Sequence, residues 1–123
     1  MGSHMGEVRT TIEIQGRDGE RRTESLDVVV DTGATLPVFP KGLLDSLGIR
    51  PEGQVVLLLG DGRRVTREVA DVRMRVEGSW VWSRAIIGES EDAAVLGLTV
   101  LEQLGLTVDP IKRRLVPTDF ILF

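Results

Sequence analysis

Apolar and polar residues alternate along most of this chain with a period of two, which is typical of β-strands that bury one face against a core. Glycine-rich stretches such as GRDGERR and GDG separate the alternating runs and predict tight turns between them. One run, ESLDVVV, becomes wholly apolar at its end, so we expect burial on both of its faces. The strands predicted in this way are residues 10–14, 24–30, the two arms of a long hairpin over 54–78, 79–87, 93–97, 107–109 and 113–117.

Two short segments have helical spacing instead. In residues 40–49, three leucines fall on one side of a helix that opens with a proline and closes at Gly48. A second helix is predicted over residues 98–106, ending near Gly105. Many short strands with two short helices predict an all-β fold, either a small barrel or a folded sandwich.

Length and charge narrow the class of protein. The chain has 123 residues, enough for one domain with a single core, and its first five residues, MGSHM, are typical of an expression-tag remnant. Residues 6–123 are then the domain. The net charge of -4 and the lack of a basic run argue against nucleic acid or an anionic membrane as partner. No apolar stretch approaches the roughly 20 residues that span a bilayer. A soluble protein is expected, and only the absence of a signal segment favours the cytoplasm.

Missing residue types restrict the chemistry further. The sequence has no cysteine and no tyrosine, and its one histidine, His4, lies in the tag remnant. A thiolate nucleophile, a Ser-His triad and a thiolate or imidazole metal site are therefore excluded. Acid–base chemistry would fall mainly on Asp and Glu, and no metal or organic cofactor is expected.

The candidate catalytic residue is Asp31, where the apolar strand ends. A carboxylate beside a core costs free energy unless it is hydrogen-bonded, paired or neutralised. Asp31 is therefore either an ordinary turn residue or a group whose ionisation is used. It is followed by Thr32, by Gly33, which suits a tight turn that brings backbone N–H groups to the carboxylate, and by Ala34.

The stretch Asp31-Thr32-Gly33-Ala34 resembles the active-site motif of the retropepsin-like aspartic proteases. The apolar segment AVLG at residues 94–97, with a helix directly after it, is similar to the segment that crosses behind the catalytic loop in that family. The glycine hairpin at residues 60–62 lies between the two motifs, where the family has its flap, and LGLTVDPIKRRLVP is similar to the tail of bacterial single-lobe members. The resemblance spans roughly residues 8–117 and implies a single-lobe retropepsin-like barrel.

This resemblance implies an aspartic endopeptidase with Asp31 as the catalytic carboxylate and with Thr32 and Gly33 shaping its turn. The motif occurs once, whereas the chemistry needs two carboxylates that share a proton, so the implied active form is a homodimer acting on a peptide or protein. Because alanine cannot donate a hydrogen bond to the carboxylate, we expect a pH optimum above that of pepsin. The implied substrate-binding residues are Ala34, Gly60, Asp61 and Gly62.

Other interpretations stay open. The main alternative is a retropepsin-like module that dimerises or binds a peptide without cutting it. An Asp that leaves a strand beside a glycine loop also occurs in phosphoryl-transfer enzymes, but those need a larger α/β scaffold. Taken alone, residues 60–62 predict only a plain hairpin turn.

Three further features are predicted from the residues alone. Trp80 and Trp82 lie on one face of a strand, which places them in the core or at a dimer contact. Asp109, before Pro110, is expected to form a turn. The apolar chain end FILF either pairs across a dimer or packs into its own barrel.

Overall fold

Nine strands and two short helices follow one another in the computed structural model, which describes residues 7–17 and 22–122. Every predicted strand and helix is present, and most of the predicted GRDGERR turn lies outside the described residues. The all-β class is therefore confirmed. The elements are β1 Val8–Gln15, β2 Thr23–Val30, β3 Val38–Pro40, α1 Lys41–Ser46, β4 Gly53–Leu58, β5 Arg64–Val76, β6 Ser79–Gly88, β7 Val95–Leu96, α2 Leu98–Leu104, β8 Leu106–Asp109 and β9 Arg114–Pro117.

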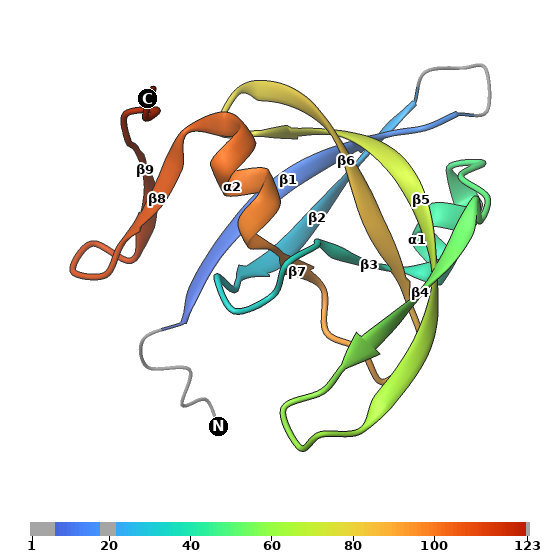
Figure 1. Ribbon diagram of the computed structural model, residues 1–123. Helices are drawn as coiled ribbons and strands as arrows, with labels where there is room; N and C mark the ends of the chain where they lie inside the picture. The colour runs from blue at the N-terminus through green and yellow to red at the C-terminus, as the bar shows by residue number, and fades with distance from the viewer. Residues whose placement is uncertain (1–6, 18–21, 123) are drawn as a thin grey trace.

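Strand pairing closes the main sheet on itself. Its order is β1-β2-β7-β3-β6-β5-β4, and β1 pairs in addition with β5, where Ile14 lies opposite Met74. β4 and the first part of β5 project from this closed sheet as a hairpin, and β8 and β9 form a separate two-stranded hairpin (Figure 1). The closed part encloses the core and leaves the β4–β5 hairpin attached at one end.

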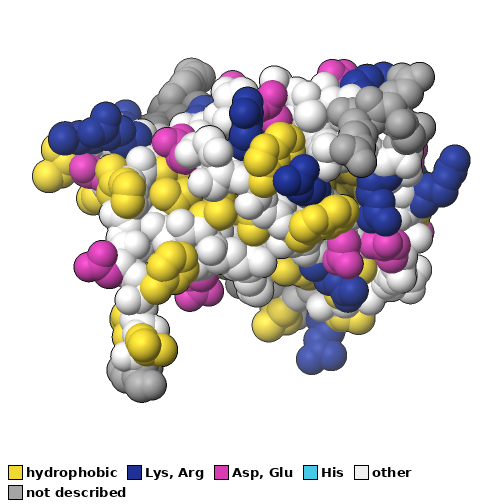
Figure 2. All heavy atoms as spheres, turned by 90° about the horizontal axis from the view of Figure 1, so that it is seen from above, with side chains coloured by type: hydrophobic (Ala, Val, Ile, Leu, Met, Phe, Trp, Pro, Cys, Tyr) yellow, Lys and Arg dark blue, Asp and Glu magenta, His cyan; other side chains and the backbone are white. Residues whose placement is uncertain are grey.

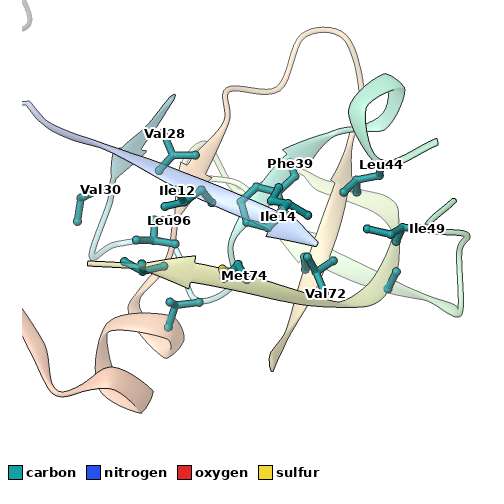
Figure 3. Close-up of a cluster of buried hydrophobic side chains, with 14 of the residues drawn as sticks. Ile12, Ile14, Val28, Val30, Phe39, Leu44, Ile49, Val72, Met74 and Leu96 are labelled. Atoms are coloured by element: carbon teal, nitrogen blue, oxygen red, sulfur yellow. The ribbon is translucent and has the colours of Figure 1, made fainter. Parts of the chain in front are cut away.

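The core lies inside the closed sheet and beneath the helices. Figure 3 shows side chains from β1, β3 and β5, among them Ile12, Phe39 and Met74, gathered in one cluster. Alternation explains the selection, because Ile12 and Ile14 of β1 are buried while Thr11, directly before Ile12, is exposed. Burial of each large aliphatic side chain contributes roughly 1.5–3 kcal/mol, so this cluster stabilises the strands that carry the candidate site.

Both helices end at glycines with left-handed backbone. The first is shorter than the predicted 40–49, since its last helical residue is Ser46 and the chain turns at Gly48, with φ 71°. The second ends as predicted at Gly105, with φ 64°. Glycine adopts this conformation without the strain that a Cβ brings. Neither helix is long and apolar enough to cross a membrane.

The tryptophans of β6 correct a prediction. Trp80 and Trp82 are 37% and 51% exposed, so of the two predicted places the core is wrong and a dimer contact stays a prediction. The strand's alternation turns the small residues Ser83 and Ala85 inward and leaves the tryptophans outside. The Arg73 guanidinium lies 4.4 Å from the centre of the Trp80 ring. Seen from above, hydrophobic and basic side chains are interspersed on the surface (Figure 2).

The C-terminal hairpin contains the predicted Asp109 turn, in which the Asp109 carboxylate accepts the N–H groups of Ile111 and Lys112 at 3.0 and 3.1 Å. Beyond β9 the chain end stays outside the barrel. Phe120 and Leu122 are 70% and 98% exposed, and Phe123 lies outside the described residues. The described part of FILF therefore does not pack into its own barrel.

Candidate active site

Asp31 stands at the carboxyl end of β2, directly after the buried part of that strand. Val28 is fully buried and Val30 nearly so, whereas Asp31 is exposed. β7 runs parallel to β2, and the Asp31 N–H donates to the Leu96 carbonyl oxygen at 3.1 Å. The core fixes the strand and β7 fixes the Asp31 backbone, so the carboxylate is presented at the surface from a rigid base.

Residues 31–34 form a tight turn that aims a backbone donor at this carboxylate. The Gly33 N–H donates to Asp31 Oδ1 at 2.9 Å, and the Ala34 N–H donates to the Asp31 carbonyl oxygen at 3.1 Å. A Cβ at position 33 would lie only 3.2 Å from Oδ1, so glycine suits the turn. The turn geometry expected for Gly33 is present, with Thr32 exposed at its tip.

The start of α2 holds the chain that follows this turn. The Leu98 N–H donates to the Ala34 carbonyl oxygen at 2.7 Å. The Thr35 carbonyl oxygen accepts two bonds from Thr99, one from its N–H at 3.1 Å and one from its Oγ1 at 2.9 Å. Residues 31–36, called here the Asp31 loop, are thus bonded to both β7 and α2.

Gly97 lets the two segments approach this closely. A Cβ at this position would lie 2.6 Å from the Leu36 carbonyl carbon and 2.9 Å from the Ala34 carbonyl oxygen. Backbone atoms cannot yield as a flexible side chain would, so only glycine fits without a shift of the loop. The segment AVLG therefore crosses behind the Asp31 loop, as the sequence predicts.

Over the described residues 7–17 and 22–122, the turn of the β4–β5 hairpin makes hydrogen bonds only among its own residues. The Leu59 N–H donates to the Arg63 carbonyl oxygen at 2.8 Å. Asp61 accepts the backbone N–H of Arg63 at 2.9 Å and its Nε at 2.6 Å, and these bonds lower the pKa of the Asp61 carboxyl. A Cβ at Gly60 or Gly62 would meet no atom within 4 Å. The tip therefore stands clear of the barrel.

A pocket of about 450 Å³ lies between this hairpin and the barrel, and we call it the hairpin pocket. Its walls are mostly aliphatic, and four charged side chains also line it. Its lining does not include residues 31–34 or 60–62, so the single chain leaves the Asp31 carboxylate outside it. The residues that line it are Val38, Leu57, Leu59, Arg63, Val65, Arg67, Ile86, Glu91, Asp92, Ala93 and Val95.

Two charged residues of this pocket are absent from the sequence prediction. Arg67 on β5 donates to Asp92 in the loop before β7, from Nε to Oδ2 at 2.7 Å and from Nη2 to Oδ1 at 3.1 Å. The sequence gives no signal for Arg67, because its parity continues through Asp71, Arg73 and Arg75, which lie on the more exposed face of β5. Nothing in the sequence pairs it with Asp92.

Within residues 7–17 and 22–122, no three His, Cys, Asp or Glu side chains are grouped so as to hold a metal ion. No family model matches the sequence. No curated protein matches it either.

The fold, in contrast, is similar to that of two viral proteases. The structure of EIAV protease complexed with the inhibitor HBY-793 superposes with a TM-score of 0.64 at 21% identity, over 89% of this chain and 99% of that one. The solution structure of simian foamy virus (mac) protease gives 0.52 at 19% identity, over 77% and 94% of the two chains. This chain therefore has the retropepsin-like fold, which confirms the resemblance at the level of architecture.

Proposed function

We propose that this chain is an aspartic endopeptidase that acts as a homodimer, with Asp31 of each chain at the centre. The observation that carries the proposal is the setting of Asp31. Its carboxylate is exposed, oriented by the Gly33 N–H at 2.9 Å, and mounted on a loop bonded to β7 and α2, within a retropepsin-like fold. Thr32 and Gly33 shape the turn.

The chemistry uses water and no protein nucleophile. Two Asp31 carboxylates share one proton, because like charges about 3 Å apart cannot both ionise easily, and they titrate as a unit. One carboxylate takes a proton from the water that attacks the peptide carbonyl carbon, and the other protonates the carbonyl oxygen. As the C–N bond breaks, the carboxyl group that took the water's proton donates it to the leaving nitrogen, and the other carboxylate regains its proton from a hydroxyl of the tetrahedral intermediate.

The dimer follows from the count of carboxylates. One chain supplies one D-T-G motif, so a second chain must bring the other Asp31 to a two-fold axis. Exposure of Asp31 and Thr32 in the single chain supports this arrangement. The exposed apolar side chains of Phe120, Ile121 and Leu122 support a contact that covers the chain end.

Substrate binds in an extended form between the Asp31 loops and the β4–β5 hairpin, which acts as the flap. An extended peptide makes strand-like main-chain hydrogen bonds, and alternate side chains enter pockets. Ala34 lies beside the substrate, and Gly60, Asp61 and Gly62 cover it. The hairpin pocket receives one of its side chains.

A peptide-library cleavage assay tests the proposal, with wild type and Asp31→Asn compared at several pH values and protein concentrations. Loss of one carboxylate from each chain is expected to lower the rate by about 1,000-fold or more. Because dimerisation depends on mass action, the specific activity of the wild type is expected to rise with protein concentration.

Three outcomes contradict parts of the proposal. Equal cleavage by both proteins removes Asp31 from the mechanism. A stable dimer without any cleavage supports the non-catalytic peptide-binding alternative. A protein that stays monomeric at high concentration while cutting peptides overturns the shared pair of carboxylates.

A further inference from the structure

Arg67 is a charged residue at a largely buried position in the first part of β5, where its nearest neighbours on the same face are apolar. It lies between Val65 and Val69 on that face of the strand, and its side chain is only 14% exposed. An arginine at a position of this kind carries a desolvation cost that must be offset locally. Departures from the local pattern of this sort concentrate at functional sites.

Asp92 provides that compensation. Its two carboxylate oxygens meet Nε and Nη2 of Arg67 in a bidentate pair, at 2.7 and 3.1 Å. Glu91 adds a weaker contact, with Oε1 3.4 Å from Nη2. Hydrogen bonds from Arg67 lower the pKa of Asp92, and the same bonds raise the pKa of Arg67, so both groups stay charged at neutral pH.

Asp92 also orders the loop to which it belongs. Its Oδ2 accepts the Glu89 N–H at 2.8 Å, and its own N–H donates to the Glu89 carbonyl oxygen at 2.9 Å. Two residues further on, the Ala94 carbonyl oxygen accepts the N–H of Val29 on β2, the strand that ends at Asp31. The Arg67–Asp92 pair therefore joins the hairpin strand β5 to a loop bonded directly to the Asp31 strand.

The pair lines the hairpin pocket together with two other charged residues, Glu91 and Arg63, of which Arg63 is paired with Asp61. Around it the walls are aliphatic, with Val38, Leu57 and Val95 among the lining side chains. Because each charge of the pair is satisfied by the other, neither is free to bind a charged substrate group. A charged side chain that entered beside the pair would lose its hydration without gaining a partner from Arg67 or Asp92.

We propose that the Arg67–Asp92 pair determines the substrate specificity of the hairpin pocket, restricting it to uncharged aliphatic side chains. This inference rests on the proposed function, since it assigns the pocket to a peptide substrate. It has a direct consequence: removal of either half of the pair exposes the other charge to the pocket. An unpaired Arg67 then favours an acidic substrate side chain, and unpaired carboxylates favour a basic one.

The test uses a set of peptides that differ only in the side chain placed in this pocket, which is Leu, Glu or Lys. The variant Glu91→Gln with Asp92→Asn keeps the shape and the acceptor for the Glu89 N–H but leaves Arg67 unpaired. We expect its preference for Glu over Leu to rise roughly tenfold or more relative to wild type. Arg67→Met leaves the carboxylates unpaired, and a similar gain is expected for Lys.

The charge exchange Arg67→Asp with Asp92→Arg separates specificity from folding. It rebuilds an ion pair in the opposite orientation, so the aliphatic preference is expected to return. Arg50→Met is the matched control, because Arg50 is exposed between α1 and β4 and does not line this pocket. Melting temperatures show which variants are folded before their specificities are compared.

A second readout keeps this inference separate from the proposed function. Binding of the same three peptides is measured by calorimetry in the Asp31→Asn background, where no hydrolysis is needed. Wild type that cuts no peptide contradicts the proposed function, while the order of affinities still tests the pair. Preference for the Leu, Glu and Lys peptides is compared in the Glu91→Gln/Asp92→Asn variant and in Arg67→Met. If both variants rank the three peptides as wild type does, in cleavage and in binding, the role of Arg67 and Asp92 is overturned.

Discussion

The Asp31 loop and the tip of the β4–β5 hairpin are both glycine-bearing turns, yet they are held in opposite ways. The Asp31 loop is bonded to β7 through Asp31 and to α2 through Ala34 and Thr35. Among the residues that the structure describes, the hairpin tip is hydrogen-bonded only within itself, mainly through Asp61 and Arg63. One turn belongs to the framework of the barrel, and the other is an appendage.

The glycine packed behind the Asp31 loop and the glycine at the hairpin tip show the same difference. At Gly97, behind the Asp31 loop, a Cβ would come within 2.6 Å of backbone, whereas at Gly60 it would meet nothing within 4 Å. A group that performs acid–base chemistry gains from a fixed position, because small displacements are costly to the rate. A segment that must admit and cover a substrate gains from freedom to move. The contrast is consistent with the Asp31 loop performing the chemistry and the hairpin tip admitting and covering the substrate.

Gly97→Ala is the most severe way to break this contrast. The added methyl group has to displace the backbone of residues 34–36, so we expect a loss of about 2–3 kcal/mol in the free energy of unfolding. Displacement of Asp31 is expected to lower kcat roughly 100-fold even in the fraction that folds. Urea unfolding and steady-state kinetics measure the two effects. A variant with unchanged stability would show that the loop is not packed against this segment.

Asp92→Asn tests whether the ion pair between Arg67 and Asp92 anchors the base of the hairpin to the barrel. Arg67 depresses the folded-state pKa of Asp92, so its stabilisation is complete above the unfolded value near 3.9 and is lost as pH falls through the lower folded value. We expect wild type to exceed the variant by about 1 kcal/mol at pH 7, with the difference shrinking below pH 4. Urea unfolding at pH 7 and at pH 3 measures this. An equal difference at both values would mean that the ion pair does not anchor the hairpin.

Ala34→Ser alters the electrostatics of the fixed turn and leaves the hairpin unchanged. A serine hydroxyl that donates to the Asp31 carboxylate favours its ionised form. We therefore expect the acid limb of the pH–rate profile to move to lower pH by roughly half to one unit. Ala34→Gly, which lacks the hydroxyl, serves as the control. Its acid limb is expected at the same pH as in the wild type. A shift of equal size in both variants would attribute it to packing.

Local patterns account for most of what the sequence predicts correctly. Alternation in β1 and the apolar end of β2 specify strands because the same side chains that alternate also fill the core. Gly105 ends a helix and Asp109 forms a turn through bonds to residues close in sequence. Features of this kind depend on neighbours within a few positions, so one sequence is enough to find them.

Features that depend on contacts between distant segments are not predicted. Arg67 and Asp92 are 25 positions apart, and only the pairing of β5 with β6 and the turn at residue 89 bring them together. The shared face of Trp80 and Trp82 predicts the core or a dimer contact, and the structure rules out the core, because the parity of β6 turns Ser83 and Ala85 inside the closed sheet. Arg73 then covers Trp80 on the outside.

Gly60→Ala is the mildest test of the contrast and isolates the hairpin tip. No atom lies within 4 Å of the added methyl group, so the free energy of unfolding is expected to change by less than about 0.5 kcal/mol. If the tip meets only substrate, the substitution changes KM while leaving stability as it is. Thermal melting and steady-state kinetics on one peptide separate the two. A clear loss of stability would mean that the tip already packs against the protein, and the difference between a fixed turn and a free one would disappear.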